Sequence, residues 1–257
     1  MQAILSFMGM SSAELALSLA VFLLAGFVKG VIGLGLPTVA VGLLSLVMSP
    51  VQAAALLIVP SMVTNVWQLL AGGAFMALAR RLWSMLAGIV LGTLVGHGWM
   101  SVDGGQRASM ALGAALVLYA LAGLASFKWS VTPGQERWCS PLAGMLTGLI
   151  TAATGVFVIP AVPYLQALDL EREQMIQALG LSFTVSTLAL ALNLGQAGLL
   201  GSGVAGASLV VLLPALLGMS IGGWLRGRVP APVFRRCFFI GLMLLGAHLV
   251  VQGVWRA

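Results

Sequence analysis

Long apolar stretches separated by short polar gaps run along the whole of this 257-residue chain. Most of them reach the roughly 20 residues that an α-helix needs to cross the hydrocarbon core of a bilayer. Two are too short, and each short one follows a break rich in glycine or in threonine and glycine. The pattern predicts an all-α integral membrane protein of about eight to ten segments, with residues 1–257 forming one domain. The stretches lie at about 13–32, 37–49, 51–72, 82–101, 107–127, 138–154, 157–168, 173–197, 203–225 and 233–255.

The composition of the chain requires a solvent that accepts apolar surface. Hydrophobic residues make up 60% of the chain and charged residues only 7%, whereas soluble proteins carry about 25% charged residues. The formal charge of +6 comes from Lys and Arg residues in the short gaps between apolar stretches. A nucleic-acid-binding protein clusters its basic residues on one face. This scattered pattern instead indicates topology anchors at the membrane surface, and it excludes nucleic acid as a partner.

The sequence predicts that the chain consists of two copies of one unit. Residues 24–32, LAGFVKGVI, match residues 142–150, LAGMLTGLI, at a constant offset. Weaker echoes follow in the same order in both copies, which indicates a repeat 1 over 13–127 and a repeat 2 over 138–255. One echo pairs two glycines of each copy, namely Gly92 and Gly96 with Gly218 and Gly222.

Each unit holds a pair of segments separated by a break, followed by three full spans. If the broken pair crosses the membrane, the unit has five crossings, and if it re-enters, the unit has three. Both numbers are odd, so the second unit must be inverted relative to the first. The predicted fold is therefore two inverted-topology repeats, each a broken helical hairpin plus three transmembrane helices. Inverted repeats with discontinuous helices are typical of secondary transporters.

Most of the basic residues fall on one side of this predicted topology. Only Arg107 and Arg256 fall on the other side. Short loops rich in Lys and Arg face the cytoplasm, so both termini are expected on the periplasmic or extracellular side of a cytoplasmic (inner) membrane. The residues of the larger group are Arg80, Arg81, Lys128, Arg137, Arg172, Arg226, Arg228, Arg235 and Arg236.

The two breaks are the candidate substrate region, because irregular backbone at membrane depth must line a cavity or be buried in protein. Gly30, Gly33 and Gly35 permit close packing and unusual dihedral angles, and Pro37 suits the first turn of a new helix. That helix start directs free N–H groups and a partial positive charge toward the break. A comparable helix start is expected after Gly155. Inversion would bring both starts toward the midplane as a two-sided anion cradle, although each glycine alone is equally explained by close helix packing.

Lys29 is the strongest single candidate for a substrate-binding residue. It lies deep in an otherwise apolar run over residues 15–47, and an intramembrane cation indicates a functional site that faces a cavity. The alternative is that its long side chain reaches the cytoplasmic interface. The equivalent residue in the second copy is the neutral Thr147, so a cationic site would be one-sided.

Uncharged polar residues gather on the third and eighth stretches, where hydroxyls and amides can bind an oxyanion without adding a competing negative charge. The polar faces are Thr64, Asn65 and Gln68 on the third and Ser182, Ser186, Thr187 and Asn193 on the eighth. Hydrogen bonds between helices explain each of them alone equally well. The candidate substrate-binding residues are Lys29, Gly30, Gly33, Gly35, Pro37, Thr38, Asn65, Gln68, Thr147, Thr151, Thr154, Gly155, Ser186 and Thr187.

The chain carries no pattern typical of an enzyme. Cys139 and Cys237 fit no metal-ligand spacing, and no Ser/His/Asp, Cys/His or HExxH arrangement stands out. None of the acidic residues lies clearly in the centre of a predicted span, so no carboxylate proton relay is visible. We therefore expect no catalytic activity, no cofactor and no metal.

The segment 26–35, GFVKGVIGLG, its echo over 144–160 and the weak duplication resemble the TauE/SafE sulfite exporter family over nearly the whole chain. The family pattern usually has consecutive glycines where this chain has Gly35 followed by Leu and Pro. Thr151 and Ala153 likewise stand in place of glycines in the second copy. These departures leave the identity of the substrate open.

The resemblance implies a transporter of sulfite, sulfonates or related sulfur-containing anions in bacterial cytoplasmic membranes, with export as the direction. We expect a secondary transporter that works by alternating access at a central site built from both broken hairpins. The alternative is an anion channel or facilitator without tight coupling. The expected partners are a small anion and the lipid bilayer, and the sequence leaves open the coupling ion and whether two copies form a homodimer.

Overall fold

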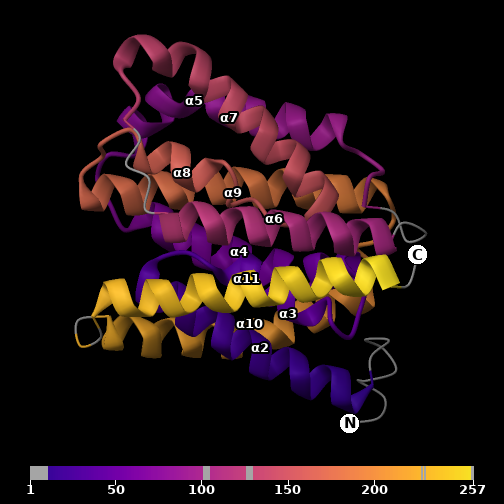
Figure 1. The fold of residues 1–257 in the computed structure, drawn as a ribbon. Helices are drawn as coiled ribbons and strands as arrows, with labels where there is room; N and C mark the ends of the chain where they lie inside the picture. Colours follow the sequence, from indigo (N-terminus) through magenta and orange to yellow (C-terminus); the bar gives the residue numbers. More distant parts are fainter. Residues whose placement is uncertain (1–10, 101–104, 126–129, 227, 229, 256–257) are drawn as a thin grey trace.

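The computed structural model describes the chain outside residues 1–10, 101–104, 126–129, 227, 229 and 256–257, so Lys128 and Arg256 lie outside the described residues. All regular structure in the described part is helical, and the long helices lie side by side in one bundle (Figure 1). Seven of the described helices are long and apolar enough to cross a membrane. The prediction of an all-α integral membrane protein is confirmed. The helices are α2 (Ser12–Ile32), α3 (Leu36–Leu44), α4 (Pro50–Leu70), α5 (Phe75–Val95), α6 (Gly105–Ala125), α7 (Pro133–Thr154), α8 (Ala161–Gln166), α9 (Arg172–Gln196), α10 (Ser202–Leu225) and α11 (Ala231–Trp255).

The helix starts follow from local sequence. Ser11 begins α2 and Ser49 begins α4, each with a capping box in which its side chain and that of Glu14 or Gln52 satisfy exposed backbone N–H groups. The predicted boundaries of six of the spans agree with the helices to within two residues, but α7 begins five residues before the expected residue 138, the short helices α3 and α8 are shorter than expected, and α5 begins seven residues before the expected residue 82. The additional turns contain the charged residues Arg80 and Arg81, which a helix tolerates at its end because long basic side chains reach the interface.

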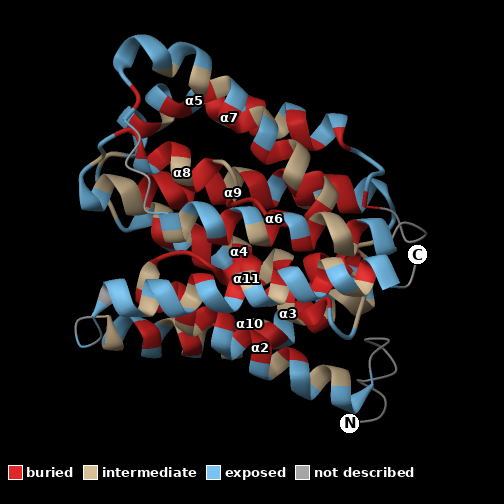
Figure 2. Ribbon diagram, in the orientation of Figure 1, coloured by how far each residue is buried: buried red, intermediate tan, exposed pale blue. Residues whose placement is uncertain are grey.

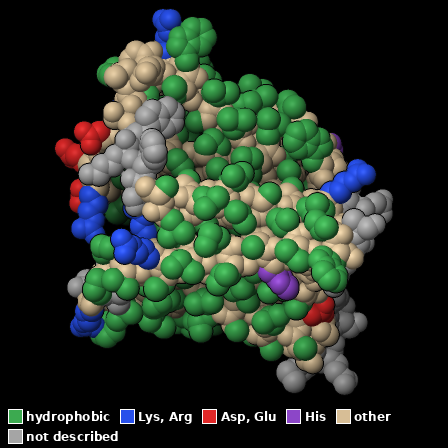
Figure 3. All heavy atoms as spheres, in the orientation of Figure 1, with side chains coloured by type: hydrophobic (Ala, Val, Ile, Leu, Met, Phe, Trp, Pro, Cys, Tyr) green, Lys and Arg blue, Asp and Glu red, His purple; other side chains and the backbone are tan. Residues whose placement is uncertain are grey.

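The outer surface of the bundle is suited to lipid. Many large apolar side chains are exposed on it, among them Trp67, Trp83 and Leu213, each with about two thirds of its surface accessible. Figure 3 shows a broad apolar face with Lys and Arg side chains gathered mainly at one end. Among the helices long enough to span the membrane, α4 and α9 are the most buried, and they pack on each other between the other helices (Figure 2). An apolar exterior of this kind is the pattern of a bundle embedded in lipid.

Two helix pairs pack with the same close geometry. α2 lies along α10, and α7 lies along α5. A Cβ atom added to Gly26 of α2 would lie 2.1 Å from the carbonyl oxygen of Ala215, and one added to Gly144 of α7 would lie 2.1 Å from that of Met85. Only glycine permits such an approach between helix backbones. The first helix of each sequence copy therefore packs in the same way on a helix of the other copy.

The packing also shows which glycine of α5 corresponds to which glycine of α10. Gly222 of α10 faces the carbonyl oxygen of Phe27, and Gly92 of α5 faces that of Met145, with 2.2 Å from the added Cβ in both cases. Phe27 and Met145 occupy matching positions in the two copies, so Gly92 corresponds to Gly222 and not, as expected, to Gly218. Glycines recur every four residues along α5. Several registers therefore fit the sequence, and only the packing selects one.

Candidate functional site

Lys29 lies in the last turn of α2 and is buried, with 2% of its surface exposed. Its Nζ donates hydrogen bonds to Oγ1 of Thr64, at 3.0 Å, and to Oδ1 of Asn65. Both partners are neutral. Among the described residues the only salt bridge joins Arg81 to Glu136, at a helix end. Lys29 is thus a buried cation with hydrogen-bond acceptors around it, and no carboxylate in the described part of the chain balances its charge.

The acceptors of Lys29 belong to a network that reaches from α4 to α9. Asn65 Nδ2 donates to Ser61 Oγ at 2.9 Å and to Thr187 Oγ1 at 3.2 Å, and these two hydroxyls lie 3.1 Å apart. Because an ammonium group can only donate, the Asn65 oxygen must face Lys29 and its nitrogen must face the hydroxyls. The network thereby links α2, α4 and α9 around one buried charge.

A proline shapes α4 immediately before this network. Pro60 has no N–H, so the carbonyl of Leu56 loses its helical donor. Ser208 of α10 replaces that donor, because its Oγ donates to Leu56 O at 2.8 Å and accepts from Val59 N at 3.2 Å. Thr64 Oγ1 donates to Pro60 O at 2.7 Å. A side chain from α10 therefore fixes the part of α4 that precedes the Lys29 ligands.

We expect Ser208→Ala to lower the stability of the protein by about 1 kcal/mol, because the Leu56 carbonyl would then be buried without a donor. Thermal unfolding in detergent measures the change. Ser220→Ala is the matched control on the same helix, since the Ser220 hydroxyl is exposed and bonds only to Leu216 O of its own helix. Equal melting temperatures for the two variants would contradict the role given to Ser208.

The first break follows Lys29 directly. Gly33 ends α2 with φ 81°, and its N–H donates to Lys29 O at 2.8 Å. Gly35 precedes α3 with φ 108°, and its carbonyl accepts from Thr38 Oγ1 at 2.9 Å. Gln68 of α4 donates from Nε2 to Gly33 O at 2.7 Å. The new helix begins at the predicted place, with the proline in its first turn, and the left-handed backbone of the two glycines explains their presence.

Arg226 binds the C-terminal end of α2, next to the first break. Its guanidinium donates to Gly30 O at 2.7 and 3.0 Å and to Val31 O at 3.1 Å. A cation at a helix C-terminus is favourable because it satisfies the last carbonyls and opposes the helix dipole. Burial lowers the pKa of Arg226, and the positive charge of Arg172 lowers it further. The guanidinium group of Arg226 therefore lies at the end of the helix that carries Lys29.

The second break differs from its prediction. Gly155 ends α7 with φ 72°, but the next helix does not follow it. Residues 156–160 are not helical, and α8 begins only at Ala161 and spans six residues. The intervening sequence is Val-Phe-Val-Ile-Pro, in which β-branched residues and the position before Pro160 both disfavour the α-helix. The expected helix start after Gly155 is wrong.

The two breaks do not meet at one point. The first is bonded to Gln68, near the end of α4. The second packs near the beginning of the same helix, since a Cβ added to Gly155 would lie 2.7 Å from that of Ala54. These contacts are about 21 Å apart along α4 at 1.5 Å per residue. The structure thus places the breaks toward opposite ends of α4 and does not form the expected two-sided cradle at the midplane.

A comparison with known protein families identifies the family of this chain. The family described as Sulfite exporter TauE/SafE matches residues 18–249, nearly the whole chain. The chain belongs to the TauE/SafE family. No curated protein and no solved structure matches it. Family membership and the apolar helices make it a multi-pass membrane protein of a transporter family for sulfite and related anions, and not of an enzyme family.

The α7 hydroxyls of this TauE/SafE protein lie outside the Lys29 network. Thr147, Thr151 and Thr154 each donate at 2.7 Å to a carbonyl one turn earlier in α7. On α9, Ser186 likewise bonds to its own helix at 2.9 Å, whereas Thr187 also joins the network. Of the predicted residues, the structure therefore brings together the following: Lys29, Asn65 and Thr187, with Gly30, Gly33, Gly35, Pro37, Thr38 and Gln68 at the adjoining break.

Two further polar residues of α9 act as anchors. Gln177 donates to Leu69 O and Gly72 O at 2.8 and 2.7 Å. Asn193 donates to Thr93 O at 3.0 Å, and its oxygen lies 2.9 Å from Nδ1 of His97. Asn193 was expected on the same polar face as Ser186 and Thr187, but its bonds go to the C-terminal end of α5. These contacts tie α9 to its neighbours and leave the Lys29 region as the polar centre of the TauE/SafE bundle.

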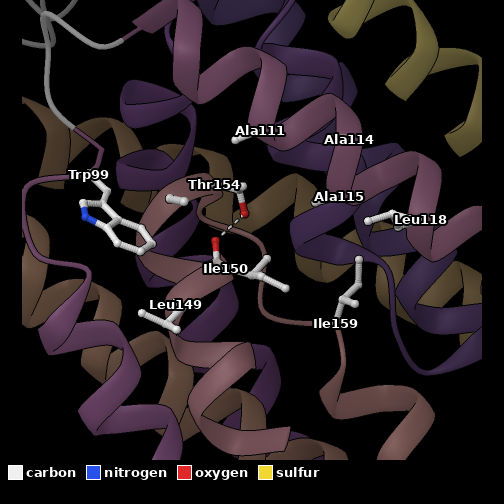
Figure 4. Close-up of a pocket in the computed structure, with 10 residues that line it drawn as sticks. Trp99, Ala111, Ala114, Ala115, Leu118, Leu149, Ile150, Thr154 and Ile159 are labelled. Carbon is white, nitrogen blue, oxygen red and sulfur yellow. Dashed lines mark hydrogen bonds between the residues drawn. The ribbon is translucent and has the colours of Figure 1, made fainter.

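An apolar crevice between α6 and α7 is a separate feature (Figure 4). Its lining includes Trp99, Leu118 and Leu149. The hydroxyl of Thr154 also borders it but donates to Ile150 O. The crevice offers no charged ligand for an anion, so it is not the candidate substrate site.

Sequence reasoning missed two residues that support the surroundings of Lys29. Ser61 lies one turn before Asn65 on the same face of α4, and this spacing was a usable signal. Ser208 has no such signal in its own helix. Its role follows only from the carbonyl that Pro60 leaves without a donor, and the helix that supplies the donor is known only from the packing.

Proposed function

We propose that this protein is a secondary transporter that exports small sulfur-containing anions of the sulfite or sulfonate class across a bacterial cytoplasmic membrane, with its anion site at Lys29. The observation that carries the proposal is the burial of Lys29 among neutral hydrogen-bond partners. A buried charge without a counter-charge is costly in a membrane protein. A bound anion supplies that counter-charge, and the family supplies its chemical class.

The first break completes the anion site. Thr64 and Asn65 hold the ammonium group in the structure, and an arriving anion takes over part of this coordination. The N-terminus of α3, seven residues after Lys29 in the chain, adds a partial positive charge at the first break. Arg226 at the end of α2 favours the approach of anions from that end. The hydroxyl of Thr187 keeps Asn65 oriented toward Lys29.

The inverted repeats, over 13–127 and 138–255, belong to the same proposal. Support comes from the two helix pairs that pack with equal geometry, α2 on α10 and α7 on α5, each joining one copy to the other. The breaks lie toward opposite ends of α4. Opening near one break and then near the other would expose Lys29 to the two sides of the membrane in turn, which is alternating access.

Saturable flux separates this carrier from an anion channel. The protein in liposomes is expected to take up radiolabelled sulfite with saturation, and unlabelled sulfite trapped inside is expected to accelerate that uptake by counterflow. A channel shows no counterflow, and its flux does not saturate at the substrate concentrations that saturate a carrier. Protein-free liposomes are the control, and linear uptake that internal sulfite does not accelerate would reject the carrier.

The orientation of the chain in the membrane follows from its charges. The end that carries Arg226 and Arg228 faces the cytoplasm in this proposal, and both termini face the periplasm. In a background without the native cysteines, a membrane-impermeant maleimide added to spheroplasts is expected to label Ala197→Cys but not Arg228→Cys. Both positions are exposed ends of helical segments. Labelling of Arg228→Cys alone would reverse the orientation.

A further inference from the structure

The amide of Gln68 has a fixed orientation. Its Nε2 lies 2.7 Å from the carbonyl oxygen of Gly33. A carbonyl oxygen only accepts hydrogen bonds, so the nitrogen of the amide must face it. The oxygen of the amide then points elsewhere. Among the described residues, Gln68 Oε1 is buried and no group donates to it. The whole residue is only 8% exposed.

The residue that carries this acceptor lies about one turn beyond the two Lys29 partners on α4. Lys29 of α2 bonds to Thr64 and Asn65 of α4, and Gly33 of α2 bonds to Gln68 of α4. Lys29 and Gly33 are four residues apart on α2, and Thr64 and Gln68 are four residues apart on α4, so the two contacts follow each other by about one helical turn along both helices. The first contact contains a buried donor with a positive charge, Lys29 Nζ. The second contains a buried acceptor, Gln68 Oε1, that receives no hydrogen bond from the described residues.

We propose that Gln68 selects anions that carry a hydrogen-bond donor in addition to their negative charge, such as hydrogensulfite or hydroxy- and aminoalkylsulfonates. The inference rests on the proposed anion site at Lys29. An anion with a donor satisfies Lys29 and Gln68 together. An anion that carries only acceptors, such as sulfate or an unsubstituted alkylsulfonate, leaves the Gln68 oxygen buried and unpaired, which costs free energy.

A second role for Gln68 makes a different prediction. If the side chain serves only to hold the break through Gly33, the oxygen has no part in recognition, and anions with and without a donor bind equally. Sites that pair a buried polar group with a substrate hydroxyl discriminate strongly against analogues without that hydroxyl. A difference in affinity between anions with and without a donor therefore tests the role of the Gln68 oxygen and not the stability of the break.

The test compares 2-hydroxyethanesulfonate with 1-propanesulfonate, which have the same charge and nearly the same size and differ in one hydroxyl group. Competition with radiolabelled sulfite for the purified wild-type protein measures both affinities. We expect the hydroxylated anion to bind about tenfold more tightly, the effect of one buried hydrogen bond. Gln68→Met is expected to reduce this ratio to near one. Gln196→Met, at an exposed position of α9, is the matched control and should keep the ratio.

The outcomes separate the two proposals. If neither sulfonate nor sulfite binds the wild-type protein, the proposed function fails. If both sulfonates bind the wild-type protein equally, the selection by Gln68 is overturned while the anion site stands. A preference that persists in Gln68→Met also overturns it. Should that variant not fold, the comparison on the wild-type protein still decides.

Discussion

Replacing Lys29 with methionine is expected to lower saturable sulfite flux by at least about a hundredfold. Methionine keeps the length and the apolar stem of the side chain but removes the charge that the anion requires. Loss of one partner of a buried, hydrogen-bonded charge pair costs roughly 3 kcal/mol or more, which corresponds to this factor. Flux into proteoliposomes that contain equal amounts of folded protein measures the change.

The stability of the same variant is expected to move in the opposite direction. Lys29 is buried and has no carboxylate partner among the residues that the structure describes. Replacing a buried charge with an apolar group of similar volume is often neutral or stabilising. The melting temperature of Lys29→Met should therefore equal or exceed that of the wild type. Arg236→Met, at an exposed position, removes a cation elsewhere and should retain flux. Normal transport by folded Lys29→Met would end the substrate role of Lys29.

Much of the fold could be predicted because the bilayer imposes simple rules on sequence. A span needs about 20 apolar residues, and this criterion alone located the long helices to within a few residues outside α5. The first break was also readable, since Gly33, Gly35 and Pro37 each have a narrow conformational use. Lys29 was noticeable because a lone cation in an apolar helix is rare. Its role in binding stays a prediction.

The relation between distant elements could not be read in the same way. The position of the second break relative to the first depends on how α7 and α2 lie along α4, which no local pattern encodes. The start of α8 was missed because the short apolar stretch was counted from its hydrophobicity and not from Pro160, which sets the helix start. Likewise, the three candidate threonines of α7 have the right chemistry, but their bonds are to their own helix.

Gly30→Val and Gly148→Val are expected to damage the protein to the same extent. An added Cβ would lie 2.3 Å from Met219 O in the first case and 2.3 Å from Ile89 O in the second. Both neighbours are backbone atoms that a side-chain rotation cannot move. The helices of each pair must separate, and overpacking of this kind costs about 3 kcal/mol or more. We expect the melting temperature in detergent to fall by roughly 10 °C in both variants.

The comparison between these two variants tests the duplication as well as the packing. Gly241→Val is the matched control, because an added Cβ there meets no atom within 4 Å and costs only helix propensity. Gly30 and Gly148 occupy the same place in the two copies, each facing a helix of the other copy, so equal losses are the signature of a repeated interface. A large loss for Gly30→Val beside a negligible one for Gly148→Val would mean that only the α2–α10 pair needs its close approach. The two halves would then have separate structural roles, and the alternating-access proposal would lose its support from symmetry.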